Sequence, residues 1–97
     1  MPKKILNIGL IGYRFMGKAH SNAWRQAPRF FDLKREVCLH TICGRNSSEL
    51  EKARVQFGWA HAQTHWHKVV ADPEIDIIDI NTPNDTHAQI AIAAAKA

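Results

Sequence analysis

The strongest constraint in this sequence is a regular alternation between two hydrophobic periods. Compact apolar runs, typical of buried strands, are each followed by a segment whose apolar residues recur every three or four positions, as in a helix. Four such units in succession are typical of a parallel sheet with crossover helices, so we expect an α/β fold. Right-handed crossovers predict a partial doubly wound sheet in the order 3-2-1-4, with helices on both faces. The strand-like runs are Ile5–Ile11, Glu36–Cys43, Ala60–Thr64 and Ile75–Ile80.

Local signals place the ends of the predicted helices. In the first helix, the apolar stripe ends at Pro28, which we expect to stop the helix and open a loop over Arg29–Arg35. Asn46 stands three residues before Glu49, the capping-box spacing, and Gly58 is expected to end that second helix. The remaining helices are predicted over His65–Ala71 and from Asn84 to the end of the sequence.

Size and composition limit the function classes. The 97 residues make one small domain, 45% hydrophobic and 23% charged, which is an ordinary globular mixture. The formal net charge is +4, but the basic residues are scattered and form no block, so we expect no nucleic-acid partner. No apolar run approaches the ~20 residues that span a bilayer, so we expect no membrane partner. Two free thiols and no recognisable signal peptide predict a cytoplasmic location.

The two cysteines are not expected to form a disulfide. Cys38 and Cys43 lie in one predicted strand, an odd number of residues apart. Their side chains are therefore expected on opposite faces, about 16 Å from each other. Neither has a neighbouring base, so neither is a persuasive nucleophile.

The segment Gly12–Gly17, with the sequence GYRFMG, follows the first strand and opens the first helix. This is the context of a Rossmann dinucleotide fingerprint. Its first glycine makes the tight turn, its third allows close packing of helix and strand, and helix N–H groups bind the phosphates. Arg14 stands where a second glycine would let the backbone approach the pyrophosphate, but its guanidinium could bind a phosphate instead. On these residues alone, an ordinary strand–helix turn with a solvated Arg14 is the alternative.

The second strand ends at Gly44, Arg45 and Asn46, with no carboxylate to bind the hydroxyls of an adenosine ribose. A small residue followed by arginine leaves room and positive charge for a 2′-phosphate, so the sequence favours NADP over NAD. A surface arginine beside a helix cap is the alternative.

A third polar loop, Asn81–Asn84, follows the fourth strand. Pro83 restricts Thr82 to extended geometry and suits a helix start, so a plain helix cap explains much of this segment. The three loops nevertheless fall at the carboxyl edge of one parallel sheet, where such folds bind ligands. Their convergence therefore predicts a single dinucleotide site.

Three stretches carry a family resemblance: GLIGYRFMGKAHSNAW, ICGRN and DIIDINTPNDTHAQIAIAAAKA. In these stretches, and over essentially its whole length, the chain resembles the nucleotide-binding domain of the Gfo/Idh/MocA oxidoreductases. That family includes glucose-fructose oxidoreductase and inositol dehydrogenase. The resemblance implies an enzyme that transfers hydride between a secondary alcohol of a sugar or cyclitol and NAD or NADP.

The resemblance also implies the roles of the loop residues. By resemblance, the pyrophosphate would be held by Gly12, Phe15, Met16 and Gly17, and Arg45 would lie near the adenosine ribose. The nicotinamide end would be lined by Thr82, Pro83, Asn84 and His87. The predicted cofactor-binding residues are Gly12, Tyr13, Arg14, Phe15, Met16, Gly17, Gly44, Arg45, Asn46, Thr82, Pro83, Asn84 and His87.

Family members continue into an E-K-P motif, whose lysine is catalytic, and into a second α/β domain that supplies the substrate site. We therefore expect residues 1–97 to form an incomplete NAD(P)-binding domain with no catalytic residue and no turnover of its own. A sugar or polyol would bind only in the full-length protein, which we expect to be a homo-oligomer. A stand-alone, non-catalytic nucleotide-binding or assembly module is the alternative.

Other side chains are expected to be structural. His61, His65 and His67 cluster without a cysteine or carboxylate at a recognised ligand spacing, so no metal site is predicted. His20 is expected to be packed or hydrogen-bonded within the fold. The tryptophans are expected in the core or at its rim: Trp24, Trp59 and Trp66.

Overall fold

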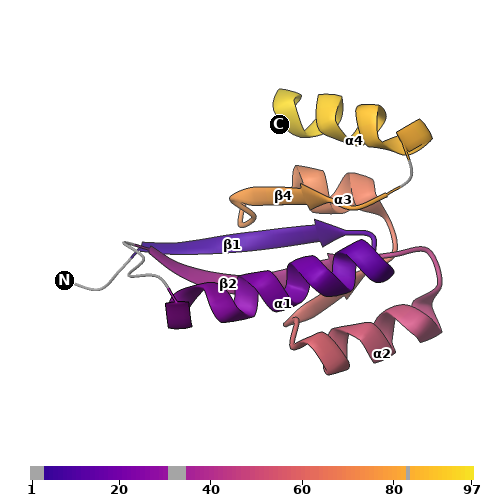
Figure 1. Cartoon of the computed structure of the whole chain (residues 1–97). Coiled ribbons are helices and arrows are strands. Elements are labelled where there is room, and N and C mark those ends of the chain that lie inside the picture. The colour runs from indigo at the N-terminus through magenta and orange to yellow at the C-terminus, as the bar shows by residue number, and fades with distance from the viewer. Residues whose placement is uncertain (1–3, 31–34, 83) are drawn as a thin grey trace.

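The computed structural model describes residues 4–30, 35–82 and 84–97. The strands form one parallel sheet in the order β3-β2-β1-β4, as predicted. All strands run in the same direction, so their carboxyl ends share the edge at the right of Figure 1. The elements are β1 (Lys4–Ile11), α1 (Phe15–Phe30), β2 (Arg35–Cys43), α2 (Ser47–Phe57), β3 (His61–Gln63), α3 (Trp66–Ala71), β4 (Ile77–Ile80) and α4 (Asn84–Lys96).

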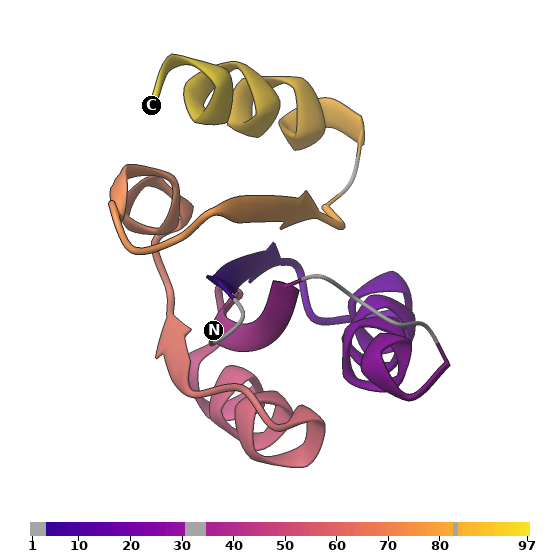
Figure 2. The same cartoon turned by 90° about the vertical axis from the view of Figure 1, so that its left-hand side faces the viewer.

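Helices cover both faces of this sheet, as expected; α1 and α3 lie on opposite sides of it in Figure 2. One core joins strand residues such as Ile8 to Leu50 of α2, with Trp24 of α1 packed against it. The other core joins Ile11 of β1 to Val69 of α3 and to α4. No helix in the described ranges is long and apolar enough to cross a membrane.

The end signals of α2 are confirmed. The Asn46 side chain accepts a hydrogen bond from the backbone N–H of Glu49 at 3.0 Å. Gly58 ends the helix with a left-handed φ of 80°, and its N–H donates to the carbonyl of Arg54. The helix therefore begins immediately after the tip of β2, which fixes where the Gly44–Asn46 segment can lie.

The expected stop at Pro28 is wrong, because α1 continues to Phe30. Proline removes one backbone donor but its own φ suits a helix, so the last turn can include it. Of the loop predicted over Arg29–Arg35, Arg29 belongs to α1 and Arg35 to β2, and residues 31–34 lie outside the described part. The fourth strand begins two residues later than predicted, at Ile77.

A β-bulge in β2 also overturns the prediction for the cysteines. Ile8 pairs with Leu39 whereas Gly9 pairs with Thr41, so His40 is an extra residue. The extra residue reverses the side-chain alternation beyond it. Cys38 and Cys43 therefore pair with Asn7 and Ile11, which lie on one face of β1, and not on opposite faces. Both cysteines are free.

Candidate dinucleotide-binding site

Backbone hydrogen bonds join the tips of β2, β1 and β4. The N–H of Gly12 donates to the carbonyl of Cys43 at 2.9 Å, which ties the loop after β1 to the end of β2. On the other side, the N–H of Asn81 donates to the carbonyl of Ile11 at 2.8 Å. The three predicted loops are therefore fixed relative to one another at one edge of the sheet.

Two glycines of the fingerprint are required by close backbone approach. Gly12 has a φ of 99°, and a Cβ built on it would lie 2.7 Å from the carbonyl oxygen of Asn81. A Cβ built on Gly17 would overlap the carbonyl oxygen of Gly12. These are the tight turn and the helix–strand packing that the motif predicts. The first turn of α1, with N–H groups that have no partner within the helix, consequently begins directly at this edge.

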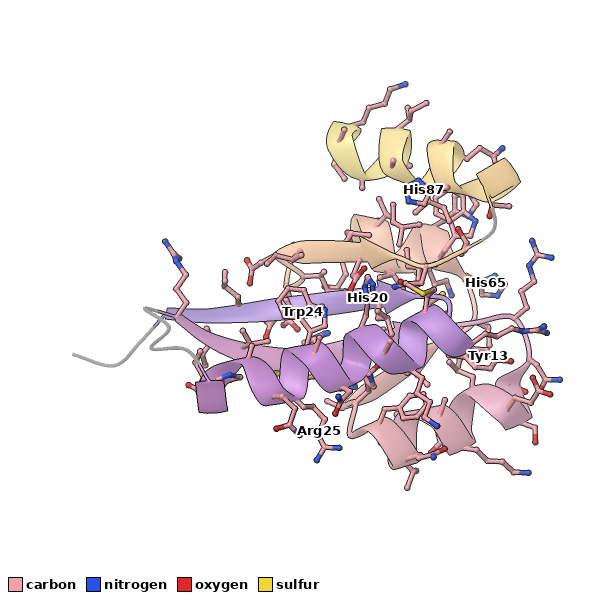
Figure 3. The ribbon with its side chains drawn as sticks, viewed as in Figure 1. Tyr13, His20, Trp24, Arg25, His65 and His87 are labelled. Atoms are coloured by element: carbon pink, nitrogen blue, oxygen red, sulfur yellow. The ribbon has the colours of Figure 1, made fainter. Side chains whose placement is uncertain are left out.

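Tyr13 closes one end of the site. Its hydroxyl donates a 2.6 Å hydrogen bond to Oε2 of Glu49, in the first turn of α2. A Cβ on Gly44 would overlap the Tyr13 ring, so the ring lies directly against the glycine. The hydrogen bond from its hydroxyl to the carboxylate raises the pKa of Tyr13. Figure 3 shows Tyr13 at the carboxyl edge of the sheet, near the start of α2.

Thr82 marks the other end. Its Oγ1 is buried and has no hydrogen-bond partner among the described residues. Such a group costs free energy unless a ligand or water satisfies it. His87 is exposed on the first turn of α4, which begins at Asn84 (Figure 3). Pro83 lies outside the described residues, as do the side chains of Phe15 and Asn84.

Exposed cationic and apolar side chains surround the glycine loop. Arg14 and Arg45 are both exposed, and neither forms an ion pair with another side chain in the described ranges. Met16, on the first turn of α1, is 51% exposed. Two arginines at an edge that presents helix N–H groups favour binding of an anion such as a pyrophosphate.

Asp79, which the sequence analysis did not single out, forms a hydrogen-bond network next to the Thr82 end. The side chain of Asp79 in β4 is 13% exposed and accepts hydrogen bonds from Trp24 Nε1 at 3.0 Å and Asn81 Nδ2 at 3.1 Å. His20 Nδ1 lies 2.8 Å from the same carboxylate. His20 is thus hydrogen-bonded within the fold, as predicted, and Figure 3 shows it beside Trp24 between α1 and the sheet.

The signal for this network was an acidic residue inside the apolar run Ile75–Ile80. A carboxylate that points from a strand into a helix–sheet interface needs donors, and two potential donors, His20 and Trp24, stand four residues apart on α1. The pairing itself required knowledge of the strand register.

Trp59 is buried in the core, and Trp24 and Trp66 pack at core edges, as expected. His65 is the N-cap of α3, where the Trp66 and His67 rings stack at 3.6 Å.

Neither metal nor thiol chemistry is favoured by the geometry. Within the ranges 4–30, 35–82 and 84–97, no group of three or more His, Cys, Asp or Glu side chains could hold a metal ion. Burial raises the pKa of the Cys43 thiol to about 11, so this cysteine is a poor nucleophile at neutral pH.

Comparison with known proteins agrees with this geometry. Residues 6–97 match the model of the family described as "Oxidoreductase family, NAD-binding Rossmann fold". Levoglucosan dehydrogenase of Pseudarthrobacter phenanthrenivorans is 45% identical over 94 residues, which are 95% of this chain and 24% of that protein. The chain therefore spans about a quarter of the length of this curated relative.

Solved structures give the same match. An oxidoreductase domain protein from Kribbella flavida superposes with a TM-score of 0.91 at 46% identity, over 99% of this chain and 25% of that one. A levoglucosan dehydrogenase in complex with NADH superposes with a TM-score of 0.93 at 41% identity, over 96% of this chain and 25% of that one.

Proposed function

The chain belongs to the Gfo/Idh/MocA oxidoreductase family, and on this premise we propose that it is the NAD(P)-binding part of a sugar or cyclitol dehydrogenase. The family predicted from the motifs is thereby confirmed, and with it an NAD-binding Rossmann fold. The substrate class is proposed because a relative that is 45% identical to this chain is a levoglucosan dehydrogenase.

One observation carries the proposal: the buried Oγ1 of Thr82 lacks a partner among the described residues, at the same edge where backbone hydrogen bonds from Gly12 and Asn81 join three strand tips. An orphaned hydroxyl beside a glycine turn and a helix N-terminus fits a ligand that brings both hydrogen-bonding and anionic groups. A nicotinamide dinucleotide brings both, through its ribose hydroxyls and its pyrophosphate.

We assign each part of the site a role toward that cofactor. The loop from Gly12 to Gly17, with Tyr13, Arg14, Phe15 and Met16 between them, binds the pyrophosphate. Thr82, with Pro83, Asn84 and His87, lines the nicotinamide end. When bound, the nicotinamide ring supplies the hydride chemistry, and the residues of this chain bind and orient it.

The adenosine end carries the cofactor preference in this proposal. Gly44, Arg45 and Asn46 follow β2, and Arg45 is exposed there with no acidic partner among the described residues. A guanidinium at this position can bind a 2′-phosphate in a bidentate manner, so we propose that NADP binds more tightly than NAD.

Calorimetric titration of the purified protein with NADP and NAD tests these assignments. NADP is expected to bind more tightly, and Arg45→Ala is expected to weaken NADP binding by about tenfold while affecting NAD less, since it removes a charged hydrogen bond. Arg25→Ala is the matched control, because Arg25 lies on α1 near Gly58, away from the strand tips. A protein that binds neither dinucleotide would contradict the proposed function.

We further propose that residues 1–97 bind the cofactor without turning over substrate, and that the whole protein is a homo-oligomer. The coverage supports the first statement, because the chain matches only a quarter of each dehydrogenase reported above. Formation of reduced nicotinamide by the purified chain with a sugar or polyol would contradict the first statement. Light scattering of the whole protein tests the second.

A further inference from the structure

Tyr13 and Glu49 link two loops of the site that lie far apart in the sequence. Tyr13 follows β1, whereas Glu49 lies in the first turn of α2, and their side chains meet at 2.6 Å. The ring of Tyr13 is held against Gly44, which could not carry a Cβ without overlapping it. The hydroxyl therefore reaches the carboxylate from a ring that packs against the end of β2.

Glu49 is also fixed through its backbone. Its N–H donates to Oδ1 of Asn46 at 3.0 Å, so the residue has a defined position in the first turn of α2, four residues after Arg45. The carboxylate thus stands at the same helix start where Arg45 is proposed to attract a 2′-phosphate. The carboxylate of Glu51, on the same helix, pairs within that helix instead: it accepts a 2.6 Å hydrogen bond from Nη2 of Arg54.

We propose that Glu49, positioned by Tyr13, is a specificity-determining residue that disfavours a 2′-phosphate and so offsets the attraction of Arg45. This inference rests on the proposed function, because it concerns the adenosine end of the same cofactor. A carboxylate can accept a hydrogen bond from a ribose 2′-hydroxyl, whereas it repels a phosphate at that position. Discrimination through a repulsive group is a general way to separate two similar ligands.

Tyr13 acts in this scheme as a positioning residue. Its hydroxyl keeps the Glu49 carboxylate at the edge of the site, while its ring packs against Gly44. Without the hydroxyl, the exposed glutamate side chain is free to turn toward solvent, and the repulsion weakens. The effect of Tyr13 on cofactor choice should therefore depend on the presence of the carboxylate.

The test compares the ratio of the Kd for NAD to the Kd for NADP in four variants of the purified protein. Glu49→Gln keeps an oxygen that can accept from Tyr13 but removes the charge, and should raise this ratio about fivefold, chiefly through tighter NADP binding. Tyr13→Phe keeps the ring and should raise the ratio about twofold. The double variant should match Glu49→Gln alone. Glu51→Gln, with the same change of charge on the same helix, should leave the ratio as in the unchanged protein.

Three results would overturn the inference. The ratio could stay constant in Glu49→Gln although both dinucleotides bind, which leaves the proposed function intact. Glu51→Gln could shift the ratio as much as Glu49→Gln, which would make the effect one of net charge. The effects of Tyr13→Phe and Glu49→Gln could multiply, which would make the tyrosine independent of the carboxylate. Failure of the unchanged protein to bind either dinucleotide would overturn the proposed function together with the inference.

Discussion

The two ends of the candidate site are built in opposite ways. At the Tyr13 end (Tyr13, Gly44, Asn46 and Glu49), the chain pairs its own polar groups, with the tyrosine hydroxyl on the carboxylate and the asparagine oxygen on a backbone N–H. At the Thr82 end (Asn81 and Thr82), a buried hydroxyl has no partner among the described residues.

This difference shows which end depends on a ligand. Polar groups that are hydrogen-bonded to one another are already satisfied in the free protein, whereas a buried hydroxyl without a partner gains one only when a ligand or water binds. We therefore expect changes at the Tyr13 end to alter which ligand is preferred. Changes at the Thr82 end should alter the stability of the free protein and ligand affinity in opposite directions.

Gly12→Ala should have the largest effect, because this residue touches both ends. The substitution places a Cβ against the Asn81 carbonyl and forces a side chain into a φ of 99°. We expect dinucleotide binding to fall by about 100-fold or more, and the free energy of unfolding by about 3 kcal/mol. Calorimetry and urea denaturation measure the two quantities.

Gly58→Ala is the matched control for that change. Gly58 also has a positive φ, of 80°, but a Cβ there would meet only the Arg25 guanidinium, at 3.9 Å. We expect a loss of about 1 kcal/mol and unchanged binding. Equal losses of binding in both variants would mean that strain, and not the contact between the two ends, decides affinity.

Alkaline pH should lower the free energy of unfolding through the buried Cys43 thiol at the end of β2. Burial raises the pKa of Cys43 from 9.0 to about 11. A raised pKa in the folded state stabilises the fold fully below the unfolded pKa, and this contribution is lost as the pH rises through the folded pKa. Between pH 9 and about 11, Cys43 should therefore cost about 2–3 kcal/mol of unfolding free energy.

The measurement is urea denaturation across that pH range, relative to Cys43→Ala, which should lack this component. Cys38→Ala serves as the control and should keep it. Identical pH profiles for Cys43→Ala and the unchanged protein would show that the buried thiol does not contribute.

Asp79→Asn tests the hydrogen-bond network of Asp79 next to the Thr82 end. The carboxylate accepts from Trp24 and Asn81 and pairs with His20, so loss of its charge should lower the free energy of unfolding by about 2 kcal/mol. Trp24→Phe removes one donor and should cost about half as much. If Asp79→Asn left stability unchanged in thermal and urea denaturation, the network would not hold α1 to β4.

Thr82→Val should have the smallest effect on stability. The sign of that effect shows whether the Thr82 hydroxyl has a partner in the free protein. Replacement of an unpartnered buried hydroxyl by a methyl group should leave the free protein as stable or slightly more stable, by up to about 1 kcal/mol. Dinucleotide binding should weaken by about threefold to tenfold, because the proposed ligand contact is lost.

Thr41→Val provides the contrast, since Thr41 Oγ1 lies 2.7 Å from His40 Nδ1 and is buried. That variant should lose about 1–2 kcal/mol with binding unaffected. A Thr82→Val protein that loses stability as Thr41→Val does would mean that the Thr82 hydroxyl is already satisfied in the free state.

The sequence was sufficient for the sheet order, because successive strand–helix units with right-handed crossovers leave few arrangements. It was also sufficient for most element bounds, because periodicity and cap residues act over a few neighbours. Asn46 and Gly58 delimited α2 for this reason. Pro28 misled, because a proline near the end of a helix costs one hydrogen bond without forbidding the last turn. The bulge at His40 could not be predicted, since it is a property of how two strands pair.

The site was predictable to the same extent. The glycine loop and its neighbours follow from a local pattern, whereas the partners of that loop are set by register. Glu49 was visible only as a cap residue, and its contact with Tyr13 joins positions 36 apart. Asp79 was visible only as a charge within an apolar run, and its contact with His20 joins positions 59 apart.

The bulge in β2 determines which way the tip of that strand faces. If β2 paired regularly with His40 still in the strand, His40 would take the place opposite Gly9. Every side chain from Thr41 onward would then turn to the other side of the sheet, so Ile42 would leave one core and Cys43 the other. Gly44 would no longer meet the Tyr13 ring, although neither residue had changed. Loss of the bulge would thus invert the last three residues of the strand, Thr41–Cys43, and remove one side of the site, whereas deletion of His40 itself would leave every other pair of the strand in place.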